Sequence, residues 1–344
     1  MRYEALFVAG VGSYLPKTVD VDDAVAMGHY DQEEQDSSGQ LSVTVAGPDD
    51  TTPDMAVRAG RVALARSGRP ARDVGLLLHA VTGYNGLDGW NAASYVQENV
   101  LDGAGVAFEV RQLSNGALAA VELAACHLAV AAGEAAVMIT AADQFPLPSW
   151  DRWRSGWGLV FADGAGSLVL SRTGGFARVL AMTTVADSSL EVLHRGTAPF
   201  GAAPDPAAYP VDLRARSLDA SLVIDFDEVG KRIESGMRKA AGTVAADLGI
   251  DVTEFDHYVV PHFGRELLRR ECADVLRIDL DRTTHGWAMR VGHLGAADQL
   301  AGLAYLTESG RLARGDRVLM IGVGGGLNWT CLALQITNAP QWGR

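Results

Sequence analysis

Apolar residues follow two patterns along the chain: short continuous runs, and longer stretches in which they recur three and four positions apart. In the first half the short runs have the length of strands, and they lie at 5–15, 75–83, 107–110 and 135–143. The stretches with helical spacing are 55–68, 92–101 and the segment after Ser114. Strands and helices therefore alternate, which predicts βαβ units around a parallel sheet.

The second half repeats this order. Residues 159–172 hold two apolar runs joined by Asp163-Gly164-Ala165-Gly166, which predicts a hairpin that closes the first half. The elements predicted after it are a strand, a helix, a strand, two helices and a last hairpin, at 176–187, 226–248, 257–263, 265–276, 294–310 and 317–336. We therefore predict an internal duplication, with one half at residues 1–172 and the other at 173–344.

One segment departs from this pattern. Residues 21–54 are acidic and rich in Gly, Ser, Thr and Pro, which predicts a surface excursion over the core. Asp54 is predicted to cap the helix that follows, and Gly68 to end it.

Composition narrows the function. With 48% hydrophobic and 21% charged residues, the 344-residue chain is typical of a soluble protein. A net charge of −13 with scattered basic residues argues against nucleic acid and anionic membrane as partners. No apolar run is expected to reach the roughly 18 residues of a membrane span, and the N-terminus is not expected to be a signal peptide. Cys126, Cys272 and Cys331 lack metal-ligand spacing, so we expect reduced cysteines in a cytoplasmic protein without a metal.

Ser114 is the first candidate for chemistry. It follows the predicted strand 107–110 and precedes a long apolar helix, with Asn115 and Gly116 permitting a tight turn. A side chain at such a junction projects beyond the strand, where the first free N–H groups of the helix can hold developing negative charge. This geometry suits acyl transfer by a serine nucleophile. A plain helix N-cap is the alternative that the local sequence leaves open.

Six motifs in order resemble the β-ketoacyl-acyl-carrier-protein synthase III family of the thiolase superfamily. They are GVGSYLP, AFEVRQLSNG, VFADGAGS, VVPHF, VGHLGAAD and GVGGGLNW, and together they cover nearly the whole chain. The resemblance implies an α/β fold of five αβαβα layers built from two similar halves, and a homodimer. It also implies acyl-CoA as a substrate rather than a cofactor, and an acyl carrier protein as a partner.

The resemblance also assigns roles to individual residues. Ser114 falls where the family has a catalytic Cys, His262 falls on its catalytic His, and His293 falls where an Asn normally stands. The backbone N–H groups of Ser114 and Gly325 match the oxyanion hole. Because a Ser hydroxyl needs a positioned base where a Cys does not, we expect His262 to act as general base, and Asp298 to orient either histidine.

Four further residues complete the expected site. His194, expected near the mouth of the pocket, is an alternative candidate for the base. Arg265, Arg269 and Arg270 follow His262 where the family docks its carrier protein, and they would supply a local basic patch on an acidic chain. The family's basic segment for the coenzyme A nucleotide is missing, because residues 31–47 are acidic here.

Three functions remain open. The serine nucleophile resembles starter-unit ketosynthases of anthracycline-type polyketide antibiotic pathways, which implies that Ser114 takes a short acyl group, propionyl by preference, from coenzyme A and condenses it with a malonyl-carrier thioester. The second possibility is an acyltransferase that passes the acyl group to a carrier thiol or a hydroxyl without condensation. The third is a non-catalytic specificity partner of a polyketide synthase.

Overall fold

The structure is a computed structural model that describes residues 3, 5–130, 136–203 and 205–342. Within these residues nine strands form one mixed sheet in the order β5-β4-β6-β7-β1-β8-β11-β10-β9. Their bounds are β1 Phe7–Tyr14, β4 Val74–Ala80, β5 Val106–Val110, β6 Ala136–Asp143, β7 Gly164–Ser171, β8 Ala177–Ala186, β9 His257–Val259, β10 Arg317–Gly324 and β11 Asn328–Ile336. A separate antiparallel pair joins β2 Lys17–Asp20 to β3 Ser42–Val45.

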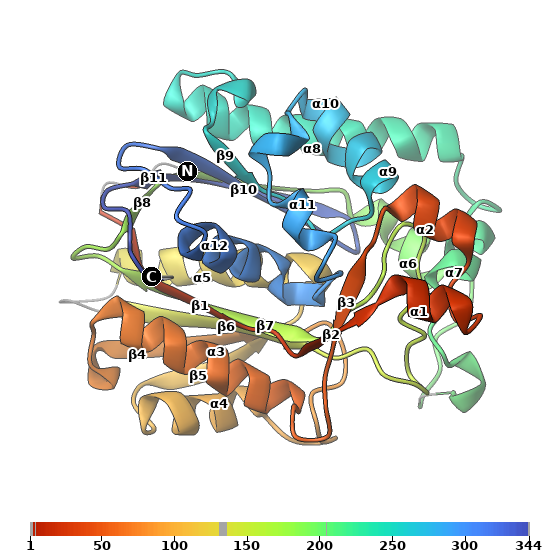
Figure 1. Cartoon of the computed structure of the whole chain (residues 1–344), viewed down its shortest axis with the longest axis horizontal. Coiled ribbons are helices and arrows are strands. Elements are labelled where there is room, and N and C mark those ends of the chain that lie inside the picture. The colour runs from red at the N-terminus through yellow and green to blue at the C-terminus, as the bar shows by residue number, and fades with distance from the viewer. Residues whose placement is uncertain (1–2, 4, 131–135, 204, 343–344) are drawn as a thin grey trace.

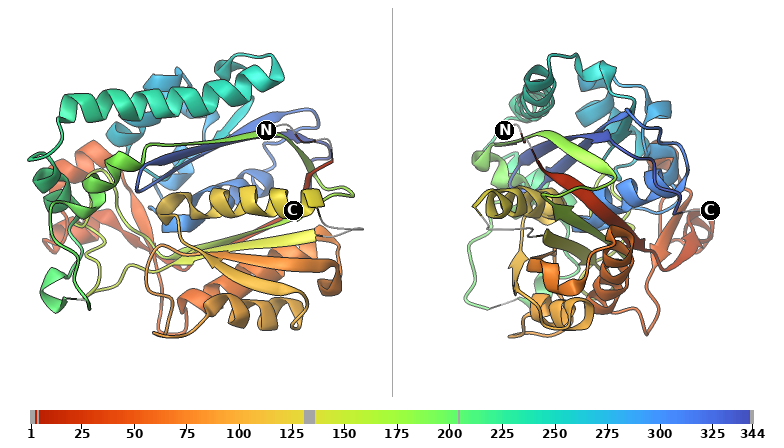
Figure 2. Two further views of the ribbon diagram at one scale, coloured as in Figure 1. Left: turned by 180° about the vertical axis from the view of Figure 1, so that it is seen from behind. Right: turned by 90° about the vertical axis from the view of Figure 1, so that its left-hand side faces the viewer.

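The helices form three layers around the two parts of this sheet (Figure 1). α3 Thr52–Ser67 and α4 Ala92–Leu101 cover the outer face of β1 and β4–β7, and α8 Phe226–Leu248 covers β8 and β11. α5 Gly116–Val130 and α12 Asp298–Glu308 lie between the two parts, as the view from behind also shows (Figure 2). The remaining helices are short and lie at α1 Val21–Ala26, α2 Gln32–Ser38, α6 Val192–Arg195, α7 Leu213–Ala220, α9 Arg265–Leu268, α10 Asp274–Leu276 and α11 His285–Ala288.

This five-layered arrangement confirms the predicted fold class. The strands before residue 172 occupy one part of the sheet and those after it the other, the two parts meeting where β1 pairs with β8. The division into duplicated halves at this boundary remains a prediction about domain organisation.

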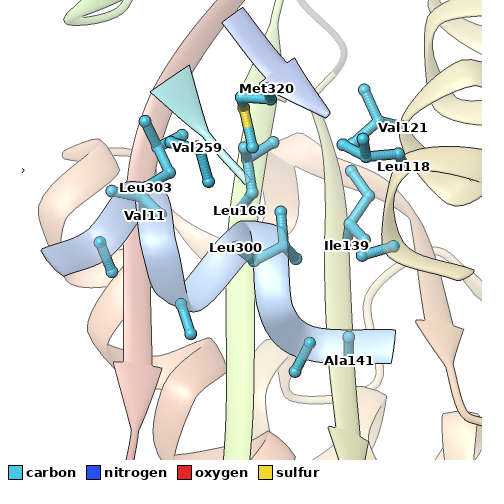
Figure 3. Close-up of a cluster of buried hydrophobic side chains, with 14 of the residues drawn as sticks. Val11, Leu118, Val121, Ile139, Ala141, Leu168, Val259, Leu300, Leu303 and Met320 are labelled. Atoms are coloured by element: carbon cyan, nitrogen blue, oxygen red, sulfur yellow. The ribbon is translucent and has the colours of Figure 1, made fainter. Parts of the chain in front are cut away.

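The core centres on the two middle helices. Leu118 and Val121 of α5 and Leu300 of α12 are fully buried, and together with residues of the flanking strands they form one apolar cluster (Figure 3). Each such side chain contributes roughly 1.5–3 kcal/mol through burial. Leu113–Val130 is also apolar enough, over 18 residues, to cross a membrane by length and composition, against our expectation. Half of that window is buried between the sheets, as in the core helix of a globular protein.

The predicted hairpin at 159–172 is wrong. β7 is a single strand that pairs with β6 on one side and β1 on the other. Gly166 lies inside it because α12 packs against that point: a Cβ there would come within 2.6 Å of the Leu300 Cβ. The glycines that suggested a turn are required instead by the close approach of a helix.

The acidic segment at 21–54 lies on the surface, as predicted, and also contributes to the core. Most of its residues are exposed or partly exposed, but Val21, Tyr30 and Val43 are buried in the main apolar cluster. The predicted cap is also wrong, because the Thr51 side chain caps α3 by accepting a hydrogen bond from the Asp54 N–H. Gly68 ends α3 in the left-handed conformation as predicted, with φ at 65°.

Candidate active site

Ser114 lies in a single 3-10 turn, Leu113–Asn115, between the end of β5 and the start of α5. Leu113 has a φ of 46°, a left-handed conformation that is costly for a branched side chain. Strain of this kind occurs at functional sites, where the surrounding structure maintains it. Ser114 therefore lies at the strand-to-helix junction that the sequence predicted.

The Ser114 hydroxyl pairs with a histidine and does not cap the helix. Ser114 Oγ is 2.8 Å from His293 Nε2, and His293 Nδ1 is 2.7 Å from Asp298 Oδ2. Hydrogen bonds from the His293 N–H to the Val160 carbonyl and from the Ala162 N–H to the His293 carbonyl fix the histidine backbone. The hydroxyl, the imidazole and the carboxylate are thus hydrogen-bonded in series, the arrangement that activates a serine nucleophile in a catalytic triad.

Asp298 is fully buried and accepts several hydrogen bonds. Besides His293, the N–H groups of Leu294 and His262 donate to its carboxylate at 2.7 and 2.9 Å. Burial alone would raise the pKa of the Asp298 carboxyl, but the two histidines and these donors outweigh it, so the pKa lies below its ordinary value. An ionised Asp298 holds the proton of His293 on Nδ1, which leaves Nε2 free to accept the Ser114 proton.

His262 does not occupy the position that the sequence predicted for it. Its Nδ1 lies 2.9 Å from the Gly292 carbonyl and 3.2 Å from Asp298 Oδ1, and its ring meets the Trp287 ring edge-on. Its Nε2 is buried and has no hydrogen-bond partner in the part of the chain that the structure describes. Burial lowers its pKa despite the nearby carboxylate, so the ring is neutral. The histidine that contacts Ser114 is therefore His293, whereas His262 contacts Asp298.

A cavity of about 480 Å³ opens above Ser114 and His293. Its walls are mainly apolar and come from three regions: the loop before β7, the segment that includes α7 and the start of α8, and the helix that begins at Arg265. The lining side chains in these walls include Trp157, Leu159, Leu213, Phe226, Ile233, Phe263, Leu267 and Leu327. Such a cavity suits a long or apolar substrate whose reacting carbonyl reaches Ser114.

His194 also lines this cavity, as the sequence predicted. Its Nδ1 is buried and has no hydrogen-bond partner among the described residues, and its ring lies beside Gly325. Burial, together with the nearby Arg216, lowers the pKa of His194, so it enters the cavity as a neutral imidazole.

The glycine run after β10 lies directly against the Ser114 turn. A Cβ on Gly324 would come within 2.6 Å of the Gln112 carbonyl oxygen, and one on Gly325 would overlap the Leu113 side chain. Only glycine permits this approach of two backbones. Gly325 and Ser114 line the same cavity, and the oxyanion hole formed by their N–H groups remains a prediction.

The three predicted carrier-binding arginines are all exposed but differ in setting. Arg265 packs its guanidinium against Gly39 at the end of α2, and Arg269 lies 3.5 Å from Asp274. Arg270 stands at the rim of the cavity with 73% of its side chain exposed. Among the residues that the structure describes, no group of three or more His, Cys, Asp or Glu side chains could hold a metal ion.

Sequence reasoning missed two polar side chains among the described residues of the cavity wall, Ser217 and Glu271. For Glu271 the available signal was spacing, because it follows Leu267 by four positions on a predicted helix and therefore shares its face.

Comparison with known proteins identifies relatives of this chain. Residues 245–336 match the family model for the C-terminal part of 3-oxoacyl-[acyl-carrier-protein] synthase III. The chain is 27% identical over 337 residues to β-ketoacyl-[acyl-carrier-protein] synthase III of Caulobacter vibrioides, covering 96% of this chain and 99% of the relative. A solved structure of ChlB3, described as an acyltransferase, superposes with a TM-score of 0.91 at 32% identity, covering 98% of this chain and all 100% of that one. FabH from Pseudomonas aeruginosa PAO1 shares the fold, with a TM-score of 0.78 at 24% identity over 98% of this chain and 100% of its own.

Proposed function

Because the chain belongs to the 3-oxoacyl-[acyl-carrier-protein] synthase III family, a group of acyltransferase-type enzymes in the thiolase superfamily, we propose that it transfers an acyl group through an ester on Ser114. One observation carries this proposal: Ser114 Oγ, His293 and Asp298 are joined by hydrogen bonds of 2.8 and 2.7 Å, and Ser114 and His293 line a mainly apolar cavity. A chain that had lost catalysis would have no reason to keep this arrangement.

In the first half-reaction Ser114 Oγ attacks the thioester carbonyl while its proton passes to His293 Nε2. The resulting imidazolium is stabilised by Asp298, and in this proposal the oxyanion accepts hydrogen bonds from the backbone N–H groups of Ser114 and Gly325. The C–S bond then breaks, the leaving thiolate takes the proton from His293, and an acyl-serine ester remains. In the second half-reaction an acceptor thiol or hydroxyl gives its proton to His293 and attacks that ester. The ester C–O bond then breaks, and Ser114 Oγ takes the proton back from His293 as the acylated acceptor leaves.

The setting of the histidines favours simple acyl transfer over condensation. Condensation requires two donors on the oxygen of the malonyl enolate, which the family supplies with its His and Asn. Here both ring nitrogens of His293 are engaged, Nε2 by Ser114 and Nδ1 by Asp298. His262 contacts Asp298 instead. The description of ChlB3 as an acyltransferase supports the same choice.

Condensation is the second candidate, and His194 is the observation that favours it. Its neutral imidazole lies in the cavity beside Gly325 and is suited to donate to an enolate oxygen. In this version Ser114 takes propionyl from coenzyme A and the enzyme condenses it with a malonyl-carrier thioester as the first step of polyketide antibiotic biosynthesis in the cytoplasm.

Product analysis tests both candidates. The wild-type protein is incubated with propionyl-CoA, and intact-protein mass spectrometry is expected to show the mass of one propionyl group, which Ser114→Ala abolishes. A carrier protein bearing a free thiol or a malonyl thioester is then added. Propionyl carrier supports acyl transfer and a β-ketoacyl carrier supports condensation, whereas no mass gain on the wild type would reject both.

We further propose that the carrier docks on Arg265, Arg269 and Arg270, because Arg270 stands at the rim of the cavity that leads to Ser114. A carrier is acidic, and its attraction to this exposed patch would offset long-range repulsion by the net charge of −13.

A homodimer is also part of the proposal. β5 is an edge strand of the sheet, yet its Val106 and Phe108 side chains are 52% and 58% exposed. Leu123 of α5, which contacts β5, is 53% exposed as well. Edge strands with exposed apolar side chains are normally covered by another part of the protein or by a partner. We propose that a second copy of this chain covers β5.

A further inference from the structure

The wall of the cavity carries one carboxylate, Glu271. It belongs to the helix that follows His262, which passes through a π-turn at Arg269–Ala273 before it ends. Leu267, Arg270 and Glu271 stand at positions i, i+3 and i+4 and share the face that lines the cavity. A π-turn is an uncommon backbone conformation that is frequent at functional sites.

The Glu271 carboxylate makes little hydrogen bonding with the protein around it. Its side chain is only 17% exposed, and the hydrogen bond that Arg270 Nη2 donates to its Oε1 is long, at 3.4 Å. Burial raises the pKa of the Glu271 carboxyl above its ordinary value, although Arg270 opposes this. An ionised carboxylate has about four acceptor positions, so most of the acceptor capacity of Glu271 is left for water or a ligand in the cavity. A ligand that displaces this water must supply a hydrogen bond of its own, or the carboxylate is left unsatisfied at a cost.

The surroundings define which ligand group fits. An anion would be repelled by the carboxylate, and a cation would meet the Arg270 guanidinium beside it. Ser217, which lines the same cavity, donates its hydroxyl hydrogen to the Leu193 carbonyl, so toward the cavity it too can only accept. A neutral donor, an amide N–H or a hydroxyl, satisfies this part of the wall.

On the premise that the proposed acyl transfer at Ser114 is correct, we propose that Glu271 is a specificity residue that accepts a hydrogen bond from a neutral N–H or O–H of the substrate in this cavity. Two sources share that chemistry. One is the amide-bearing arm of the thioester donor, and the other is the acceptor that takes the acyl group.

The test compares three variants in the two half-reactions. Glu271→Leu removes the acceptor, Glu271→Gln retains a carbonyl oxygen, and Glu266→Leu is a matched control on an exposed carboxylate of the same helix that does not line the cavity. Thermal unfolding verifies that each variant is folded. Acylation is followed by intact-protein mass spectrometry with propionyl-CoA and with S-propyl thiopropionate, which has no N–H or O–H group.

If the thioester arm is the source, Glu271→Leu lowers acylation from propionyl-CoA about 10-fold, leaves acylation from S-propyl thiopropionate unchanged, and Glu271→Gln stays near wild type. If the acceptor is the source, both acylations are unchanged. Transfer from enzyme pre-acylated with S-propyl thiopropionate to pantetheine then falls in Glu271→Leu alone. The proposal is overturned if Glu271→Leu matches Glu266→Leu in every assay. Failure of the acyl-serine mechanism is separate, because it would appear as absent acylation of the wild type.

Discussion

Replacing Ser114 by Cys should release the first chemical step from its dependence on His293. In the wild type the hydroxyl proton has one route, across the 2.8 Å hydrogen bond to His293 Nε2. A thiol has a second route, because at neutral pH a few per cent of it is already thiolate without any base. The test is therefore a double-mutant cycle, in which Ser114→Cys and His293→Ala are made singly and together.

The expected magnitudes follow from the geometry. A general base in direct contact with the nucleophile is worth about 10²–10⁴-fold in rate, so His293→Ala should slow acylation of Ser114 by that factor. In the Ser114→Cys background the same substitution should cost no more than about 10-fold, since the thiolate forms at a helix N-terminus that lowers a thiol pKa. The two losses should thus differ by at least about 10-fold.

The assay is rapid-quench acylation with propionyl-CoA, read by intact-protein mass spectrometry for all four proteins. His262→Ala serves as the control, because His262 contacts Asp298 at 3.2 Å and has no hydrogen bond to Ser114 among the described residues. Losing that support should slow acylation by no more than about 10-fold.

Two results would refute this account. If His293→Ala costs the same factor with Ser and with Cys at position 114, His293 does not take the nucleophile's proton. If His262→Ala slows acylation more than His293→Ala does, the base is His262 after all, and the position of His293 in the structure does not describe the reacting state.

Three further predictions concern stability and assembly. Burial lowers the pKa of His79 to about 4, so the ring stays neutral in the folded protein but is protonated below about pH 6.5 in the unfolded chain. Acid should therefore destabilise the fold through this residue. Between pH 7 and pH 4 the free energy of unfolding, measured by urea titration, should fall about 3 kcal/mol more in the wild type than in His79→Asn. Phe108→Lys on the exposed edge strand should convert a homodimer to monomers in light scattering, and a wild-type monomer would remove the proposed interface. Gly324→Ala should slow acylation of Ser114 at least about 10-fold by displacing its turn, whereas Gly242→Ala, whose Cβ meets no atom within 4 Å, should instead raise the free energy of unfolding by about 1 kcal/mol.

Elements whose limits are set by local chemistry could be predicted from the sequence. The helix at 226–248 is the clearest case, because the Asp225 side chain caps its first turn and Gly249 ends it in a left-handed conformation. The glycines at 164 and 166 misled the prediction because a glycine demanded by a turn and one demanded by a packed helix look the same in sequence. The second kind depends on α12, more than 130 residues further along the chain.

The site shows the same limit. Ser114 could be found from its neighbours in sequence, since the strand, the turn and the helix are all local. The choice between His262 and His293 could not, because both lie far from Ser114 in sequence and both contact Asp298. Only the folded positions of the two rings decide which nitrogen reaches the hydroxyl.

The two departures from the family pattern are best understood as one coupled change. A serine at position 114 needs a base whose tautomer is fixed, and an Asn at position 293 could not provide one. A histidine at 293 lies five residues before Asp298, whose carboxylate is held by the Leu294 and His262 N–H groups and faces His293 Nδ1. Serine at position 114 without His293 would leave a hydroxyl without a base. His293 without the serine would place a base beside a thiol that does not need one. Retention of His262 fits this view, because its backbone and ring help to hold the carboxylate on which the new base depends.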